Sequence, residues 1–179
     1  MQQALHENPN YGVASLEYAP LVADVVEALG VKEVLDYGAG KGRLGGELRK
    51  YIKRPLNIRH YDPAIPQWSA APEACEFVAS IDVLEHIEPA LLDNVLDDLK
   101  RVTARAAMFT VHTGPAVKVL LDGRNAHLIQ QPPAWWLPKN SCKVRAGAVQ
   151  PAAERVLGRR RTKNQVKVRA AELGRVDRS

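Results

Sequence analysis

The sequence contains no run of 18 apolar residues, so we expect no membrane-spanning helix. Its first residues also lack a basic stretch followed by an apolar core, and no secretory signal peptide is predicted. Only two cysteines are present, Cys75 and Cys142, and they show neither metal-site spacing nor a nearby cysteine motif. Two such residues are typical of reduced thiols, so we expect a cytoplasmic protein.

The 179 residues are enough for one domain with a well-buried core. The most informative stretch is V-L-D-Y-G-A-G-K-G-R-L at 34–44, which predicts a buried strand, a glycine-rich turn and a helix. Glycines at 38, 40 and 42 allow positive φ angles and let a ligand lie against bare backbone. The start of the next helix offers unpaired N–H groups to an anionic group.

Two common nucleotide motifs are absent from this stretch. The dinucleotide pattern G-x-G-x-x-G would need a glycine at position 43, which is Arg43, and the pattern G-x-x-x-x-G-K-[ST] does not occur. Asp36 would repel a pyrophosphate, but it would attract the sulfonium and ammonium groups of S-adenosylmethionine. The motif therefore favours that cofactor, with a glycine turn that merely packs closely as the alternative.

A second acid, Asp62, ends the predicted strand at 56–63 and comes 20 positions after Gly42. An acid at this distance from a glycine loop, at the carboxyl end of a strand, is where a ribose diol is bound in open α/β sheets. Its two oxygens can accept both ribose hydroxyls.

A third apolar run, at 77–87, ends in Asp82, Glu85 and His86. With D-Y-G-A-G-K-G, Y-D-P and S-I-D-V-L-E-H-I, residues 10–137 resemble class I S-adenosylmethionine-dependent methyltransferases. They are similar to the subgroup of quinone-biosynthesis O-methyltransferases and uncharacterised bacterial and phage enzymes.

The resemblance implies that the first glycines and Asp36 line the methionyl part of the cofactor, that Asp62 binds the ribose, and that residues 82–86 border the sulfonium and the acceptor. The expected cofactor-binding residues are Asp36, Gly38, Gly40, Asp62, Pro63, Asp82 and Val83, and the expected catalytic residues are His86 and Glu85.

The remaining patterns predict helices at 15–29, 42–51 and 88–102 and a strand at 105–112. We therefore expect an α/β fold with a doubly wound, mostly parallel, Rossmann-like sheet. Only 14 residues separate Asp62 from Phe77, so the usual third-strand region is shortened or missing, and the adenine contact is unassigned. Ile65 and Trp68 are candidates for it.

Residues 114–140 form a long connection, which we expect to be a substrate-side lid over the strand ends. Trp135 and Trp136 follow two prolines and suggest a short helix. Equally, the two tryptophans could simply cover the core.

Histidines 86, 112 and 127 could converge with Asp82 and Glu85 on one site. In the favoured interpretation no metal is present, and a neutral His86 acts as a general base. D-x-x-E-H also resembles the E-x-x-E-H metal motif of small-RNA 2′-O-methyltransferases. In that alternative Asp82, Glu85, His86 and His127 hold a divalent ion.

Charge divides the chain unevenly. Residues 141–179 contain 11 Lys and Arg against 3 Asp and Glu, a net charge of +8, whereas residues 1–140 have a net charge of −3. This basic C-terminal segment suggests nucleic-acid contact. Alternating segments at 142–149 and 164–170 slightly favour an antiparallel hairpin that closes the sheet instead. We treat residues 1–140 as the methyltransferase core and 141–179 as a closing hairpin or tail.

The sequence thus predicts a methyltransferase that acts on an O- or N-nucleophile of an unidentified small-molecule acceptor. Two alternatives stay open: a nucleic-acid methyltransferase that uses the basic segment, and a non-catalytic S-adenosylmethionine-binding protein. The sequence leaves the oligomeric state undetermined.

Overall fold

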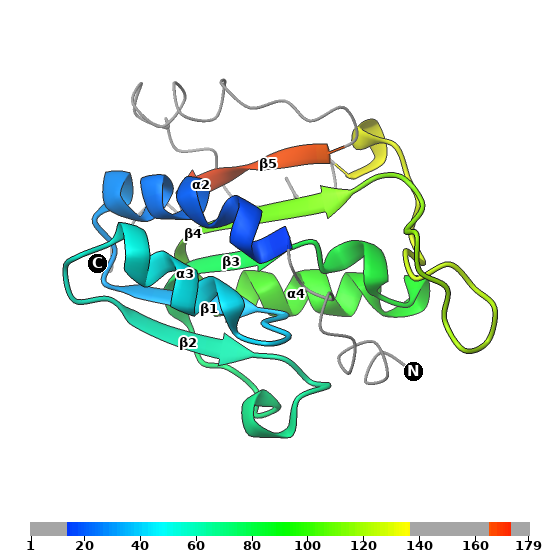
Figure 1. The fold of residues 1–179 in the computed structure, drawn as a ribbon, viewed down its shortest axis with the longest axis horizontal. Coiled ribbons are helices and arrows are strands. Elements are labelled where there is room, and N and C mark those ends of the chain that lie inside the picture. The colour runs from blue at the N-terminus through cyan, green and yellow to red at the C-terminus, as the bar shows by residue number, and fades with distance from the viewer. Residues whose placement is uncertain (1–13, 137–164, 173–179) are drawn as a thin grey trace, which may run out of the picture.

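A computed structural model describes residues 14–136 and 165–172, with side chains for 15–136 (Figure 1). Five strands form one sheet in the order β2-β1-β3-β4-β5. They are β1 (Glu33–Tyr37), β2 (Asn57–Tyr61), β3 (Cys75–Ile81), β4 (Thr103–His112) and β5 (Gln165–Glu172). The first four pair in parallel, and β5 pairs antiparallel with β4. The predicted mostly parallel sheet is confirmed.

Helices cover both faces of the sheet, so the molecule has three layers (Figure 1). The helices α2 (Ala14–Leu29) and α3 (Arg43–Tyr51) lie on one face and α4 (Leu92–Val102) on the other. Successive strand residues alternate between these faces: Phe77 and Ala79 pack toward α2 and α3, and Val78 packs toward α4. Because both faces are covered, the central strands are apolar on both sides.

The predicted helices at 15–29, 42–51 and 88–102 are present within a few residues of their expected ends. The helix α2 ends at Gly30, which has φ of 62° and donates its N–H to the Glu27 carbonyl oxygen over 3.1 Å. This is the left-handed C-cap that glycine provides most readily. The last predicted helix begins with a 3₁₀ turn, η3 (Pro89–Leu91), before α4.

The segment between β2 and β3 holds one 3₁₀ turn, η1 (Pro66–Trp68), and no strand or α-helix. Within the described residues β2 is therefore the edge strand, and the expected shortening of this region is confirmed. Trp68 packs against His60, with ring centroids 4.7 Å apart.

The connection after β4 is described as far as residue 136. Val119 and Asn125 form an isolated antiparallel bridge, and Gly123, with φ of 83°, makes the turn between them. Residues 133–136 are helical, as expected, and Trp136 is fully buried in the core beneath α4. The core-covering interpretation therefore holds for Trp136. Residues 137–140 of the expected lid lie outside the described part.

The strand expected at 164–170 is present as β5, which extends the sheet beyond β4. Its expected hairpin partner at 142–149, the basic run at 159–161 and Cys142 lie outside the described residues. Cys75 is a buried free thiol in β3. None of the described helices has both the length and the apolar character needed to cross a bilayer.

Candidate functional site

A cavity of about 490 Å³ lies at the carboxyl edge of the four parallel strands. Its walls come from the segments that follow β1, β2, β3 and β4, which all leave the sheet at this edge (Figure 1). Eight of the nine expected site residues line it: Asp36, Gly38, Gly40, Asp62, Pro63, Asp82, Val83 and His86. Glu85 does not line the cavity, because its side chain is fully buried behind the wall.

The glycine loop joins β1 to α3 and depends on left-handed backbone. Gly38, Gly40 and Gly42 have φ angles of 79°, 53° and 65°. The N–H groups of Gly38 and Ala39 both donate to the Tyr61 carbonyl oxygen, over 2.8 and 3.0 Å. A Cβ on Gly38 would lie 2.5 Å from Val83 Cγ2, so this position also needs glycine for space. The loop is therefore fixed against the ends of β2 and β3.

Asp36 lies on β1 with 4% of its surface exposed, and it lines the cavity. Its Oδ2 is 3.3 Å from His60 Nδ1 on the neighbouring strand β2. Burial raises the pKa of Asp36, while His60 opposes that shift. A cationic group in the cavity would favour the ionised form of this carboxyl.

Asp62 follows β2 and already holds the backbone of two loops. Its Oδ2 accepts the Gly40 N–H over 2.8 Å, and its Oδ1 accepts the Ala64 N–H over 2.9 Å. Each carboxylate oxygen has a further lone pair, so two hydroxyl groups of a ligand could still be bound. Ile65 and Trp68, the candidates for an adenine contact, do not line the cavity, whereas Tyr61 and Ala64 do.

Asp82 follows β3 in an uncommon conformation, with φ of 52°. The Thr110 hydroxyl donates to its Oδ1 over 2.6 Å, and the Asp82 N–H donates to the Thr110 carbonyl oxygen over 3.1 Å. These bonds tie the end of β3 to β4. Burial raises the pKa of Asp82, and the hydrogen bond from Thr110 opposes the shift.

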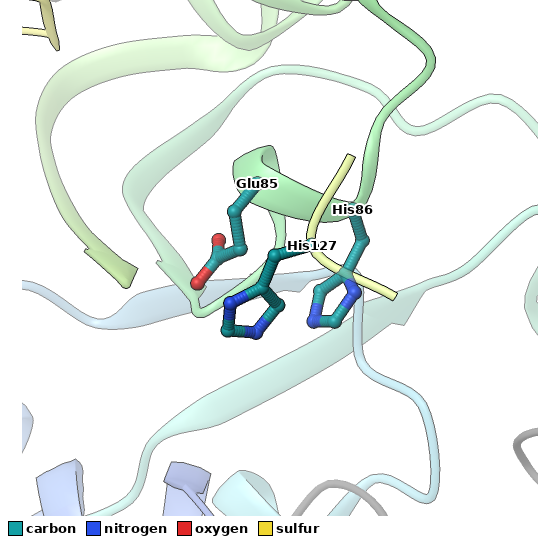
Figure 2. A group of neighbouring side chains, drawn as sticks. All are labelled: Glu85, His86 and His127. Carbon is teal, nitrogen blue, oxygen red and sulfur yellow. The ribbon is translucent and has the colours of Figure 1, made fainter. Parts of the chain in front are cut away.

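Glu85 and His86 lie on the 3₁₀ turn η2 (Leu84–His86), and His127 approaches them from the connection after β4 (Figure 2). Glu85 Oε1 accepts the His112 N–H over 2.7 Å. The His127 ring is 4.8 Å from that of His86 and 4.9 Å from that of His112, between centroids. The expected convergence of the three histidines with Glu85 is therefore present.

The protonation of this cluster is shifted strongly by burial. The pKa of Glu85 rises to about 8, because burial disfavours its negative charge and the nearby Asp82 carboxyl repels it. The pKa of His86 falls to about 4, because burial disfavours its cationic form. Burial also lowers the pKa of His127. At neutral pH both imidazoles of this pair are neutral.

Backbone carbonyls determine which ring nitrogen of each histidine carries the proton. His86 Nδ1 is 2.8 Å from the Ala126 carbonyl oxygen, and His127 Nδ1 is 2.7 Å from that of Gly114. A carbonyl oxygen can only accept, so each neutral ring carries its proton on Nδ1 and has its lone pair on Nε2. One ligand atom from each of Glu85, His86 and His127 lies within 4.8 Å of the other two, which makes these residues a possible cation-binding group.

Asn125 and Arg124, which the sequence did not single out, hold the connection that carries His127. Asn125 Oδ1 accepts the N–H groups of Ala116 and His127, each over 2.9 Å, and its Nδ2 donates to the Ala116 carbonyl oxygen. Arg124 makes two hydrogen bonds to Glu88, of 3.0 and 2.8 Å. Nothing in the local sequence indicated where this segment would dock.

No protein-family model and no curated protein matches this sequence. Solved structures do match the fold. A putative O-methyltransferase from Nostoc punctiforme is 14% identical, with a TM-score of 0.55 over 78% of this chain and 52% of its own. Mitomycin 7-O-methyltransferase MmcR is 13% identical, with a TM-score of 0.56 over 78% and 53%.

A third structure is the 1,6-didemethyltoxoflavin-N1-methyltransferase of Burkholderia thailandensis, with its acceptor and S-adenosylhomocysteine bound. It is 17% identical, with a TM-score of 0.50 over 75% of this chain and 70% of its own. This chain spans about half of the length of the other two structures. At these identities the likeness concerns the fold. The protein has the Rossmann-like α/β fold of the S-adenosylmethionine-dependent methyltransferases.

Proposed function

We propose that this protein is an S-adenosylmethionine-dependent methyltransferase that acts on an oxygen or nitrogen nucleophile of a small molecule. The observation that carries the proposal is the cavity in which the glycine loop, two buried acids and His86 meet. Its volume falls within the range of about 300–1,000 Å³ that is usual for small-molecule sites. Structures with the same fold are O- or N-methyltransferases by their descriptions, which supports this class.

In this proposal each of the three segments at the strand ends contacts a different part of the cofactor. Asp36 supplies a negative charge to the ammonium and sulfonium groups, and the glycine loop gives the methionyl part access to the backbone. Asp62 accepts hydrogen bonds from the ribose hydroxyls. Asp82 and Val83 border the sulfonium, and Pro63 lies beside the nucleoside.

The reaction is an in-line displacement. A lone pair of the acceptor attacks the methyl carbon, the bond from sulfur to that carbon breaks, and the sulfonium becomes the neutral thioether of S-adenosylhomocysteine. The protein contributes mainly by aligning the two reactants. An acceptor hydroxyl must also release its proton, and we assign His86 Nε2 to take up that proton in the metal-free protein.

The test is methyl transfer from radiolabelled S-adenosylmethionine into a lysate separated into small-molecule, nucleic-acid and protein fractions. We expect label in the small-molecule fraction. His86→Gln should lower that rate about 100-fold, the smaller end of the range for losing a general base, while its affinity for S-adenosylmethionine stays within about twofold of wild type. Asp97→Asn, an exposed acid on α4, is the control.

Other distributions of the radiolabel would contradict parts of the proposal. Label confined to nucleic acid would contradict a small-molecule acceptor. Tight cofactor binding with no label in any fraction would contradict an enzyme and favour a binding protein. If His86→Gln is as active as wild type, His86 does not act as the proton acceptor.

A further inference from the structure

Three potential ligand atoms come together in the wall of the cavity. Atoms of Glu85, His86 and His127 lie within 4.8 Å of one another, and two separate segments supply them (Figure 2). Glu85 and His86 are fixed to the turn η2, while His127 is held by Asn125 in the hairpin after β4. The group therefore depends on the docking of that hairpin against η2.

Both imidazoles are oriented as they are in known metal sites. A histidine that binds a metal through one ring nitrogen usually donates the N–H of the other to a carbonyl or carboxylate oxygen. His86 and His127 each direct Nδ1 at a backbone carbonyl oxygen, those of Ala126 and Gly114. In both rings the nitrogen with the lone pair is Nε2, so Nε2 would be the ligand atom.

The carboxyl of Glu85 supplies the third donor. Its side chain is fully buried, and its Oε2 has no hydrogen-bond partner among the described residues, although Oε1 is bonded to the His112 N–H. A buried polar atom left without a partner costs about 1–3 kcal/mol. A cation beside Oε2 would remove that cost. Asp82, by contrast, is not part of the group, and its Oδ1 accepts the hydrogen bond from Thr110.

We propose that Glu85, His86 and His127 bind one divalent transition-metal ion in the wall of the cavity. One carboxylate and two imidazoles suit Zn²⁺, Mn²⁺, Fe²⁺ or Co²⁺, whereas Mg²⁺ and Ca²⁺ prefer oxygen ligands alone. Bond lengths of about 2.0–2.2 Å require the three donors to move closer together than the 4.8 Å within which they now lie.

Three protein ligands leave coordination positions open toward the cavity, as in catalytic rather than structural metal sites. This role rests on the proposed function, although the site itself does not. When bound, the ion would lower the pKa of an acceptor hydroxyl, and His86 would then be a ligand instead of the proton acceptor. The acceptor would accordingly carry a hydroxyl or another oxygen donor that can complete the coordination sphere.

The experiment measures metal binding without turnover. The full chain, free of affinity tags and stripped with a chelator, is titrated with Co²⁺ and with Zn²⁺ by calorimetry, and the Co²⁺ absorption spectrum is recorded. Glu85→Gln and His127→Gln are the test variants. Asp97→Asn, which neutralises an exposed carboxyl of α4 outside the group, is the control. Circular dichroism and S-adenosylmethionine affinity report folding and the cofactor site separately.

We expect one equivalent of ion in the wild type and in the control, with the visible Co²⁺ bands of a site with imidazole ligands. Each test variant should bind at least 100-fold more weakly while it keeps the wild-type circular dichroism spectrum. Equal binding by wild type and test variants, or no binding by wild type, would overturn the metal site. Normal metal binding without any affinity for S-adenosylmethionine would instead overturn the proposed function and leave the site intact.

Discussion

At the scale of single residues, Asp36 is a buried acid in the wall of the cavity, paired with His60. Asp36 is buried on β1, and its carboxylate contacts the His60 ring on β2, directly opposite in the strand register. Burial raises the pKa of this carboxyl, so the folded protein binds its proton more tightly than the unfolded chain does. Ionisation of Asp36 therefore destabilises the folded protein, and a bound cationic ligand would offset that loss.

The sign of this effect gives a prediction for stability against pH. The contribution of Asp36 to folding is fully present below its unfolded pKa of 3.8 and is lost as the pH rises toward its higher folded value. Asp36→Asn cannot ionise, so its stability relative to wild type should increase between pH 4 and pH 7. Urea unfolding at several pH values, without cofactor, measures this difference. Parallel curves for the two proteins would show that burial of Asp36 carries no such cost.

At the scale of elements, the glycine loop and α3 contain glycines with opposite requirements. Gly38 has a positive φ, and a Cβ there would overlap Val83. Gly46 is exposed inside α3, with nothing within 4 Å of an added Cβ and no positive φ. Gly38 therefore needs to be glycine for its left-handed backbone and for docking against Val83 after β3, whereas Gly46 in the helix does not.

Alanine at these two positions should act in opposite directions. Gly38→Ala should destabilise the protein by about 1–2 kcal/mol from its left-handed backbone alone, with more from the contact with Val83, and should abolish cofactor binding. Gly46→Ala should stabilise it by about 0.5–1 kcal/mol, because alanine favours a helix interior. Thermal melting and calorimetry with S-adenosylmethionine check both. If Gly38→Ala melts and binds like wild type, the loop does not have the geometry described.

At the scale of the whole molecule, the local sequence predicts the site residues that lie at the carboxyl ends of the strands. Asp36, Gly38, Asp62 and Asp82 were placed in one site because parallel strands bring their carboxyl ends to the same edge, and all four line the cavity. The end of α2 at Gly30 also depends only on the local sequence. These features need only the order of strands and helices.

The remaining features depend on contacts between distant segments. Trp136 packs into the core beneath α4, and its sequence position after two prolines did not distinguish this from a lid. Glu85 is turned into the interior to accept the His112 N–H, although the D-V-L-E-H-I pattern suggested an acid facing the site. His127 reaches η2 because Asn125 closes its hairpin, a tertiary arrangement without periodicity in the sequence.

We propose that the cavity at the carboxyl edge of the sheet binds S-adenosylmethionine through Asp36 and Asp62. Isothermal titration calorimetry of wild type, Asp36→Asn, Asp62→Asn and the Asp97→Asn control tests it most directly. We expect stoichiometric binding by wild type and control, and affinity at least tenfold weaker in each of the other two, because each loses a carboxylate that is proposed to contact the ligand. Equal affinity in all four proteins, or none in wild type, would contradict it.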